Sequence, residues 1–357
     1  MKPISLGRVL LLPLPLPLPG LPDLKTPRTV HSLCNCYATM SDLTDDPTKP
    51  TSQNALQTPQ NYPVPLSPPL PPMSKDIELS RAMSASSKSS LYTISRRDFI
   101  YEDEWLIAVN KPQGVYCESV FDSVRKVLSD SAEPGIEASP PELHLANRLD
   151  RDTSGLMLIT KSHKVAAKLV KAFATHRVTK TYIALCIGSV PKWEKITIQS
   201  GHGRSKFGAW RVYAASDVGR TLPGGSVVRD METSFELLSV NGQGIFKEPS
   251  EFKKDEGNVI VVEERAEIYT DGEKDEILVR ARPKSGRSHQ IRLHCQYLGI
   301  SIRGDVKYEG LYEWKGRTYD GHELHAESLS FEHPITGLPL VFRAPLPSWA
   351  SEALQQQ

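Results

Sequence analysis

Cysteine and long apolar runs are both scarce in this chain of 357 residues. The five cysteines form no Cys-x-x-Cys pair, which argues against a disulfide framework and against a structural zinc site. The apolar run at residues 9–18 is too short and too often broken by proline to span a bilayer. We therefore expect a reducing intracellular compartment, no membrane partner and no bound metal.

An excess of charge of one sign is missing as well. Lys and Arg number 43 against 42 Asp and Glu, so the formal net charge is +1, unlike that of a histone-like nucleic-acid binder. The charge is nevertheless segregated, because windows 144–182 and 280–307 each carry six more basic than acidic residues, whereas window 251–276 carries six more acidic ones. Basic windows are commonly only solvated surface. Two of them, combined with the unusual residues below, favour a polyanionic substrate.

Proline divides the chain into two parts. Sixteen of the 28 prolines fall in residues 1–80, including LPLPLPLPG at 12–20 and YPVPLSPPLPP at 62–72. Alternating proline removes amide donors and fixes φ, so residues 1–90 are predicted to be a disordered leader rich in proline and serine. Its basic beginning is similar to an organelle transit peptide. Chloroplast or mitochondrion on one side, and cytoplasm or nucleus on the other, stay open as locations.

From residue 91 onward the sequence has the pattern of a folded domain. Strands are predicted at 105–109, 156–160, 181–187, 233–240 and 276–282. A helix with one apolar and one lysine-rich face is predicted at 162–175, and a short helix at 290–298 is ended by Gly299. Because the order of strands and helices lacks regular βαβ spacing, the pattern indicates an α+β fold. A polar, acidic insertion is expected near 241–276.

The most informative string is NRLDRDTSG at residues 147–155. It places the carboxylate of Asp150 between two arginines, which lower the pKa of a neighbouring carboxyl group. The Thr-Ser-Gly turn that follows can satisfy the local backbone and hold the loop rigid. By composition alone, an ordinary ion-paired surface turn is the better interpretation of this string.

The string resembles the HRLD-x-x-TSG motif of the RluA family of RNA pseudouridine synthases, and further motifs of that family follow in order along residues 98–347. These are similar to the segments 99–112, 179–182, 286–294, 304–308 and 324–334. The resemblance implies a pseudouridine synthase fold over residues 91–357, with a mixed, mainly antiparallel central sheet and flanking helices. It also implies isomerisation of uridine in ribosomal, transfer or messenger RNA, with no cofactor.

The resemblance further implies the site residues. Asp150 matches the family's nucleophile, Tyr182 the tyrosine that stacks on the target base and is a candidate for proton removal, and Arg292 the arginine that pairs with the carboxylate. Arg148 matches an arginine that fills the gap left by the flipped nucleotide, and Asn147 replaces the family's histidine. Further substrate-binding candidates are Arg151, Lys180, Arg204, Lys206, Arg287, His289 and Gln290.

The chemistry agrees with this assignment, because the isomerisation involves no net redox change and a desolvated carboxylate can act as a covalent nucleophile. Two alternatives stay open. One is a catalytically inactive RNA-binding relative, against which the intact set of Asp150, Tyr182 and Arg292 argues. The other is an unrelated hydrolase that uses the same carboxylate.

Two further segments contain residues that could bind a metal ion or RNA. The spacing of His322-Glu-Leu-His325 is one residue short of a zinc-protease motif, so His325 is predicted to be a structural strand residue. The basic segment with Arg204, Lys206 and Arg211 is a candidate RNA contact, and an exposed turn with solvated charges is the alternative.

Overall fold

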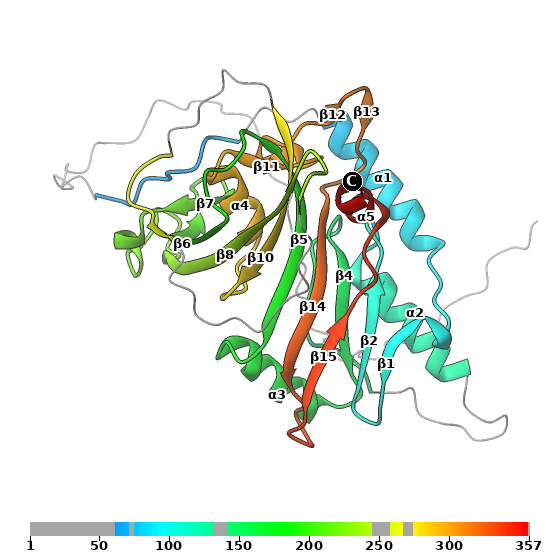
Figure 1. Cartoon of the computed structure of the whole chain (residues 1–357). Coiled ribbons are helices and arrows are strands. Elements are labelled where there is room, and N and C mark those ends of the chain that lie inside the picture. Colours follow the sequence, from blue (N-terminus) through cyan, green and yellow to red (C-terminus); the bar gives the residue numbers. More distant parts are fainter. Residues whose placement is uncertain (1–60, 71–74, 131–141, 245–257, 267–273, 356–357) are drawn as a thin grey trace, which may run out of the picture. The chain divides into compact units, whose positions relative to one another are not determined.

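One large mixed sheet carries the fold (Figure 1). The computed structural model describes residues 61–70, 75–130, 142–244, 258–266 and 274–355. The helices are α1 (Lys75–Ser90), α2 (Cys117–Asp130), α3 (His163–Ala174), α4 (Gln290–Tyr297) and α5 (Ser348–Gln355). The strands are β1 (Phe99–Glu102), β2 (Leu106–Lys111), β3 (His144–Leu145), β4 (Ser154–Thr160), β5 (Thr179–Gly188), β6 (Lys195–Arg204), β7 (Trp210–Tyr213), β8 (Arg229–Val240), β9 (Asn258–Val261), β10 (Asp275–Pro283), β11 (Ile300–Ile302), β12 (Glu313–Trp314), β13 (Arg317–Thr318), β14 (Leu324–Glu332) and β15 (Pro339–Arg343).

The sheet runs in the order β1-β2-β4-β14-β5-β10-β8-β6-β7, with β3, β9, β11 and β15 paired at its sides. Two pairs within the described ranges are parallel, β4 with β14 and β6 with β9, and the other pairs are antiparallel. The predicted α+β class with a mixed, mainly antiparallel sheet is confirmed. The strands and the two helices predicted from periodicity are all present, with ends shifted by a few residues.

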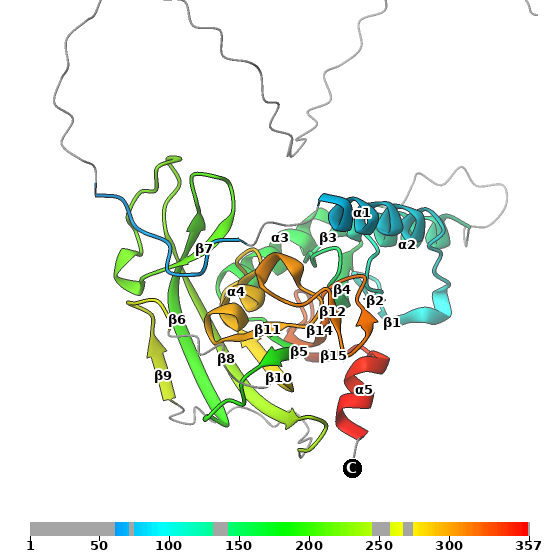
Figure 2. The same ribbon diagram turned by 90° about the horizontal axis from the view of Figure 1, so that it is seen from above.

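Both faces of the sheet are covered by helices. The face with Ile107 and Met157 packs against α2, and further along the sheet the same face packs against α4. The opposite face of β2 and β4 packs against α3, and that of β5 packs against α5. Figure 2 shows α1 and α2 side by side on one side of the sheet and α5 on the other. Burial on both faces explains why β4 is buried at every position and contains the continuous apolar run at 156–159.

The last part of the expected leader differs from the structure. Residues 75–90 form helix α1, in which Arg81 and Ala85 are buried. Ahead of the helix, the backbone N–H of Leu66 donates to the carbonyl oxygen of Val212 at 2.8 Å. The predicted boundary at residue 90 is therefore too late, because tertiary contacts fix a Ser-rich segment that has no apolar stripe of its own. Residues 1–60 lie outside the described residues.

The acidic insertion lies between β8 and β10, where it was expected. Strand β9 belongs to it and extends the sheet by pairing in parallel with β6. Residues 245–257 and 267–273 of the insertion lie outside the described residues. Among the helices that the structure describes, none has both the length and the apolar character needed to cross a membrane.

Buried histidines predict that the fold loses stability in mild acid. Burial lowers the pKa of His202, His322 and His325 to about 4 and that of His294 to about 3. The unfolded chain binds these protons at a pKa near 6.5, so stability is retained above that pH and lost as the pH falls toward 4. At pH 5 the protonation of each histidine in the unfolded chain lowers the free energy of unfolding by about 2 kcal/mol. The four effects together approach the whole stability of a typical domain. Urea denaturation at pH 7 and pH 5 measures the loss.

The matched control for this prediction is His294→Asn, which removes one of the four buried imidazoles. Burial lowers the pKa of His289 to about 3 as well, so five histidines share the change. The free energy of unfolding of His294→Asn should therefore vary less between pH 7 and pH 5, by about a fifth of the wild-type change. A free energy of unfolding that is equal at both pH values would contradict the prediction.

Candidate active site

The loop that precedes β4 is fixed to that strand by Asn147. The Asn147 side chain donates to the carbonyl oxygen of Leu156 at 3.2 Å and accepts from the amide of Leu158 at 2.7 Å. Thr153 N–H donates to the carbonyl oxygen of Asp150 at 3.1 Å and closes the turn. Asn147, whose role the family motif leaves open, thus anchors the segment that presents Asp150.

The Thr-Ser-Gly part of the loop is held by the start of β14. Because β14 runs parallel to β4, the two strands begin at the same edge, with His325 opposite Ser154. Thr153 Oγ1 lies 2.7 Å from His322 Nε2, and Ser154 Oγ lies 2.8 Å from His325 Nδ1. Gly155 has a φ of +111°, and a side chain there would collide with the β14 backbone. The prediction that His325 is a structural strand residue is confirmed.

A buried lysine supports the loop from the other side. Lys111, at the end of β2, is 0% exposed, and its ammonium group donates to the carbonyl oxygens of Val115 at 2.7 Å, Arg151 at 2.8 Å and Pro112 at 3.1 Å. Burial lowers its pKa to about 8, so the group is still a cation at pH 7. Lys111 therefore ties the residue that follows Asp150 to the turn after β2.

Replacing this lysine with methionine tests its structural role. Lys111→Met keeps most of the length of the side chain but removes the donor to three carbonyl oxygens, of which that of Arg151 keeps only the amide of Gly114, so we expect a loss of about 3–5 kcal/mol of stability. Urea denaturation measures the change. Lys161→Met, which removes a more exposed ammonium group bound to Glu102, is the control and should cost about 1 kcal/mol. Equal losses in the two variants would contradict the prediction.

One cavity of about 560 Å³ brings the predicted site residues together. Nine of the eleven line it: Arg148, Asp150, Arg151, Lys180, Tyr182, Arg287, His289, Gln290 and Arg292. Arg204 and Lys206 are not among the lining residues. They lie at the end of β6 and in the turn to β7, where their cationic groups contact the rings of Trp210 and Phe207.

An arginine shared by two carboxylates forms the polar centre of the cavity. Arg292, in α4, donates from Nη1 to Asp150 Oδ2 at 2.8 Å. Its other donors form a bidentate pair with the buried Asp305, at 2.6 Å from Nε to Oδ2 and 2.9 Å from Nη2 to Oδ1. The guanidinium carbon also lies 5.0 Å from the ring centroid of Tyr308. Asp305 and Tyr308 thus fix the direction in which Arg292 points at Asp150.

These contacts keep Asp150 ionised. Burial raises its pKa, but the charge of Arg292 and the hydrogen bond from it outweigh that effect, so the pKa lies well below the usual value. The side chain keeps 34% of its surface open to the cavity. His289 Nε2 lies 3.8 Å from the same carboxylate oxygen, and its Nδ1 is 2.7 Å from Tyr308 Oη. The arrangement provides an accessible carboxylate anion on the wall of a hollow.

Tyr182 places an aromatic ring beside this carboxylate. It lies on β5, where its neighbours on the adjacent strands are Ala281 and Ala326, small residues that leave the ring room. Burial and the nearby charge of Asp150 raise its pKa to about 12. The phenol is therefore protonated at neutral pH, which suits a neutral stacking surface better than a proton acceptor.

The remaining candidate residues differ in how exposed they are and in their ion pairs and hydrogen bonds within the protein. Arg148 forms an exposed ion pair with Glu118 at 2.8 Å, so its guanidinium group is open to the mouth of the cavity. Arg287 pairs with Asp230 at 2.7 Å. Lys180 is buried and donates to the carbonyl oxygen of Ser285 at 2.6 Å.

Gln290 is occupied within the protein. Its amide group donates to the carbonyl oxygen of Glu232 and to Thr233, and its oxygen accepts from Ser285 and from the amide of Arg287. The geometry assigns this side chain to shaping the segment at 285–288, and the same holds for Lys180. In the ranges that the structure describes, no group of three or more His, Cys, Asp or Glu side chains is placed to hold a metal ion.

Sequence reasoning missed several residues of this site. Asp305, Tyr308 and Lys111 lie in the segments at 304–308 and 99–112 that resemble the family, but the resemblance gives them no role. Lys111 could have been suspected from its position after an apolar strand. Asp305 could not, because its partner Arg292 is defined only by the folded chain.

Comparisons with known proteins agree with the family suggested by the motifs. A family described as RNA pseudouridylate synthase matches residues 105–297. "RNA pseudouridine synthase 1" of Oryza sativa subsp. japonica is 64% identical over 294 residues, which cover 82% of this chain and 84% of that protein. The protein of the same name from Arabidopsis thaliana is 64% identical over 293 residues, covering 82% and 88%. "Ribosomal large subunit pseudouridine synthase C" of Pasteurella multocida is 29% identical over 271 residues, covering 73% and 68%.

Proposed function

The chain belongs to the RNA pseudouridylate synthase family, whose members are isomerases, and from this we propose that it converts uridines in RNA to pseudouridine with Asp150 as the nucleophile. The observation that carries the proposal is the position of Asp150. It is an ionised, accessible carboxylate held by Arg292 beside the ring of Tyr182, in one cavity. A carboxylate in such a setting can form a covalent intermediate without help from a metal or redox cofactor.

In this reaction the uracil base leaves C1′ of the ribose, turns, and bonds to the same carbon again through C5. In the proposed path Asp150 attacks C1′ of the ribose, and the N1–C1′ bond breaks with its electrons passing to the uracil ring. The base turns so that C5 faces C1′, forms the new C–C bond and releases Asp150. C5 then loses its proton to water and N1 gains a proton, so the composition of the nucleotide is unchanged although the C5 hydrogen is exchanged. Attack by Asp150 on the base is the second path that the same geometry permits.

The neighbouring side chains have distinct proposed roles. Arg292 keeps Asp150 ionised and pointed into the cavity, and Tyr182 offers its ring as a surface for the flipped base. Arg148, at the mouth, is the cation placed to fill the space that the flipped nucleotide vacates. The uracil anion that the reaction requires would lie close to the cations of the cavity wall, which favours its formation.

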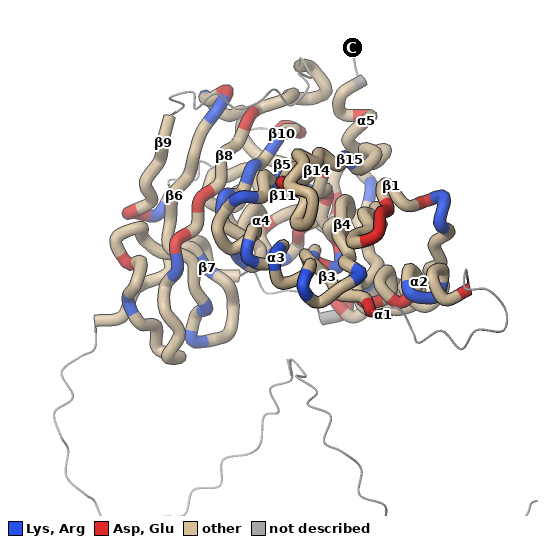
Figure 3. The backbone as a smooth tube through the Cα atoms, turned by 90° about the horizontal axis from the view of Figure 1, so that it is seen from below, with Lys and Arg blue, Asp and Glu red and all other residues tan. Residues whose placement is uncertain are grey.

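RNA is proposed to continue from the cavity along basic surface. Lysines follow one another along α3 (Figure 3), and a groove of about 670 Å³ there is lined by Lys168, Lys171 and Arg177. Such cations contact phosphates without reading sequence, which fits a substrate chosen by shape. The acidic positions in β8, red in Figure 3, lie away from α3 and leave this surface positive.

Release of tritium from carbon 5 of uridine tests the proposal directly. The purified chain is incubated with total RNA carrying that label, because formation of the new C–C bond at C5 expels the label into water. Release by the wild type but not by Asp150→Ala is the expected result. No release by a folded wild-type chain would contradict the function, and equal release by the variant would contradict the role of Asp150.

A further inference from the structure

A second hollow lies against the catalytic carboxylate, on the side of helix α1. It measures about 210 Å³ and shares four residues with the first cavity: Asp150, Arg151, His289 and Arg292. Helix α1 contributes Glu78 and Arg81 to its wall. This helix precedes residues 105–297, which the family match covers, and the activity proposed above assigns it no part.

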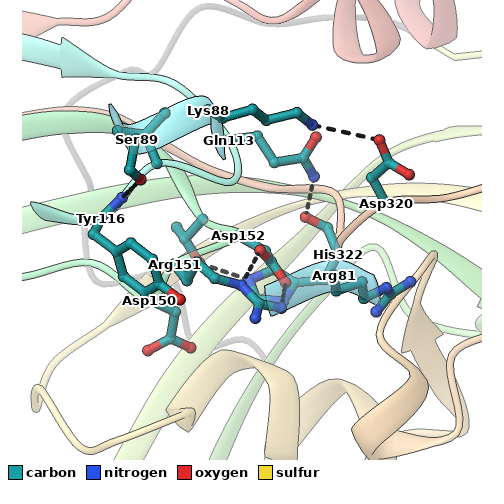
Figure 4. Close-up of polar contacts among 12 residues, drawn as sticks. Arg81, Lys88, Ser89, Gln113, Tyr116, Asp150, Arg151, Asp152, Asp320 and His322 are labelled. Atoms are coloured by element: carbon teal, nitrogen blue, oxygen red, sulfur yellow. Dashed lines mark hydrogen bonds and ion pairs between the residues drawn. The ribbon is translucent and has the colours of Figure 1, made fainter. Parts of the chain in front are cut away.

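Helix α1 is attached to three separate segments around this hollow (Figure 4). Arg81 donates to the carbonyl oxygen of Tyr319, and its guanidinium carbon lies 5.6 Å from the ring centroid of Tyr312. Ser89 Oγ accepts from the amide of Tyr116 at 3.1 Å, and Lys88 pairs with Asp320 at 3.4 Å. The helix therefore bridges the turn after β2 and the segment that leads into β14, which are the two supports of the catalytic loop.

Arg81 lines this hollow together with Asp152 of the loop. Its side chain is buried at 6% exposure, and its Nε has no hydrogen-bond partner among the described residues. Burial lowers the pKa of Arg81, and the charge of Asp152 is the largest effect that opposes it. Burial raises the pKa of Asp152, but the hydrogen bond from Arg151 and nearby positive charges, that of Arg81 among them, outweigh this and lower it. Asp152 in turn accepts two hydrogen bonds from Arg151, at 2.7 Å and 2.8 Å.

Arg151, which is bound by Asp152, directly follows the proposed nucleophile Asp150 in the sequence. The carbonyl oxygen of Arg151 is held by Lys111 and by the amide of Gly114, so its backbone is fixed while its side chain depends on Asp152. Gly321 packs so closely against Asp152 that a Cβ would lie 2.8 Å from its side chain. Asp152 therefore rests on the segment at 319–321, which Arg81 holds through the carbonyl oxygen of Tyr319. Loss of Arg81 would loosen that segment and, through Asp152, the side chain of Arg151.

We propose that Arg81 is a positioning residue for the loop that carries Asp150, and that helix α1 helps to hold this loop in the geometry needed for turnover. The inference rests on the proposed function, and it adds a residue outside the matched family segment to the site. Arg81 borders the hollow on the far side of Asp150 from Arg148 and Tyr182, which line only the first cavity. It is therefore expected to act on turnover, with little effect on the binding of RNA.

The test compares Arg81→Ala with wild type in the full chain. We expect tritium release at saturating RNA to fall about 10–100-fold, with KM changed less than about twofold, since small misplacements of reacting groups carry costs of this size. Guanidinium ions at about 20–50 mM should restore part of the rate by filling the vacated site, whereas sodium chloride at equal concentration should not. Arg96→Ala, which removes an exposed arginine paired with Glu102, is the control and should keep full activity.

Hydrogen exchange measured without RNA tests the positioning role of Arg81 independently of the proposed enzymatic function. The amide of Thr153, which donates to the carbonyl oxygen of Asp150, should exchange faster in Arg81→Ala than in wild type or Arg96→Ala. If wild type releases no tritium, the function fails while the exchange result still decides the role of Arg81. Unchanged exchange, an unchanged rate, or a loss of RNA affinity without a fall in turnover would overturn the inference.

Discussion

Asp150→Asn is expected to abolish turnover while leaving RNA binding nearly intact. The asparagine keeps the shape of the side chain and an oxygen that can accept from Arg292, but it has no anion with which to attack the ribose. Loss of a nucleophile that acts together with its partners lowers rates by roughly 10⁴-fold or more. Single-turnover tritium release gives the rate, and filter binding with the same RNA gives Kd, which should change less than about threefold.

The control for Asp150→Asn is another carboxylate changed in the same way. Asp122→Asn removes a charge from an exposed side chain of α2 that does not line the cavity. It should retain full turnover. A residual rate in Asp150→Asn within about tenfold of wild type would exclude this carboxylate as the nucleophile, because amides do not replace carboxylates in that role.

Arg292→Ala is expected to lose turnover by about 10²–10³-fold, the size found when one stabilising donor is removed from an active site. The substitution also leaves Asp305 buried without its bidentate partner, so a loss of stability of about 3–5 kcal/mol should accompany it. RNA affinity should fall far less than turnover, because Arg292 lies deep in the cavity behind Asp150. Circular dichroism and single-turnover kinetics together measure the two effects.

A double variant separates catalysis from folding at this position. Arg292→Ala combined with Asp305→Ala removes both buried charges, so stability should return toward the wild-type value. Turnover should remain as low as in Arg292→Ala, since Asp150 still lacks its partner. Recovery of activity together with stability would mean that Arg292 acts only through the fold.

The strands and the string at 147–155 were predictable because their signals are local. Apolar runs such as residues 156–160 need only a buried sheet to become strands, and the order of motifs placed Asp150, Tyr182 and Arg292 in one site. The short helix at 290–298 could also be predicted from the sequence, because Gly299 adopts the left-handed conformation that ends it.

Helix α1 and the buried supports were not predictable from local pattern. The segment at 75–90 has neither an apolar stripe nor a strong start signal, and its order depends on contacts made by Arg81 and Ser89 with distant residues. Lys111 likewise looks like a surface lysine until three carbonyl oxygens converge on it. Arg204 and Lys206 were candidates because a basic segment at this place contacts RNA in the family that the motifs resemble, and such a contact does not require them to line the cavity.

The parallel pairing of β4 with β14 has a consequence for synthesis of the protein. Ser154 and His325 are hydrogen-bonded across 171 positions of the chain, so the support of the Asp150 loop is made long after the loop itself. During translation at about 5–20 residues per second, the nascent chain holds its carboxylate without the strand that fixes it for many seconds. A ribosome that stops before β14 would thus release a chain without a complete site. The enzyme becomes competent to modify RNA only when nearly all of it has been made.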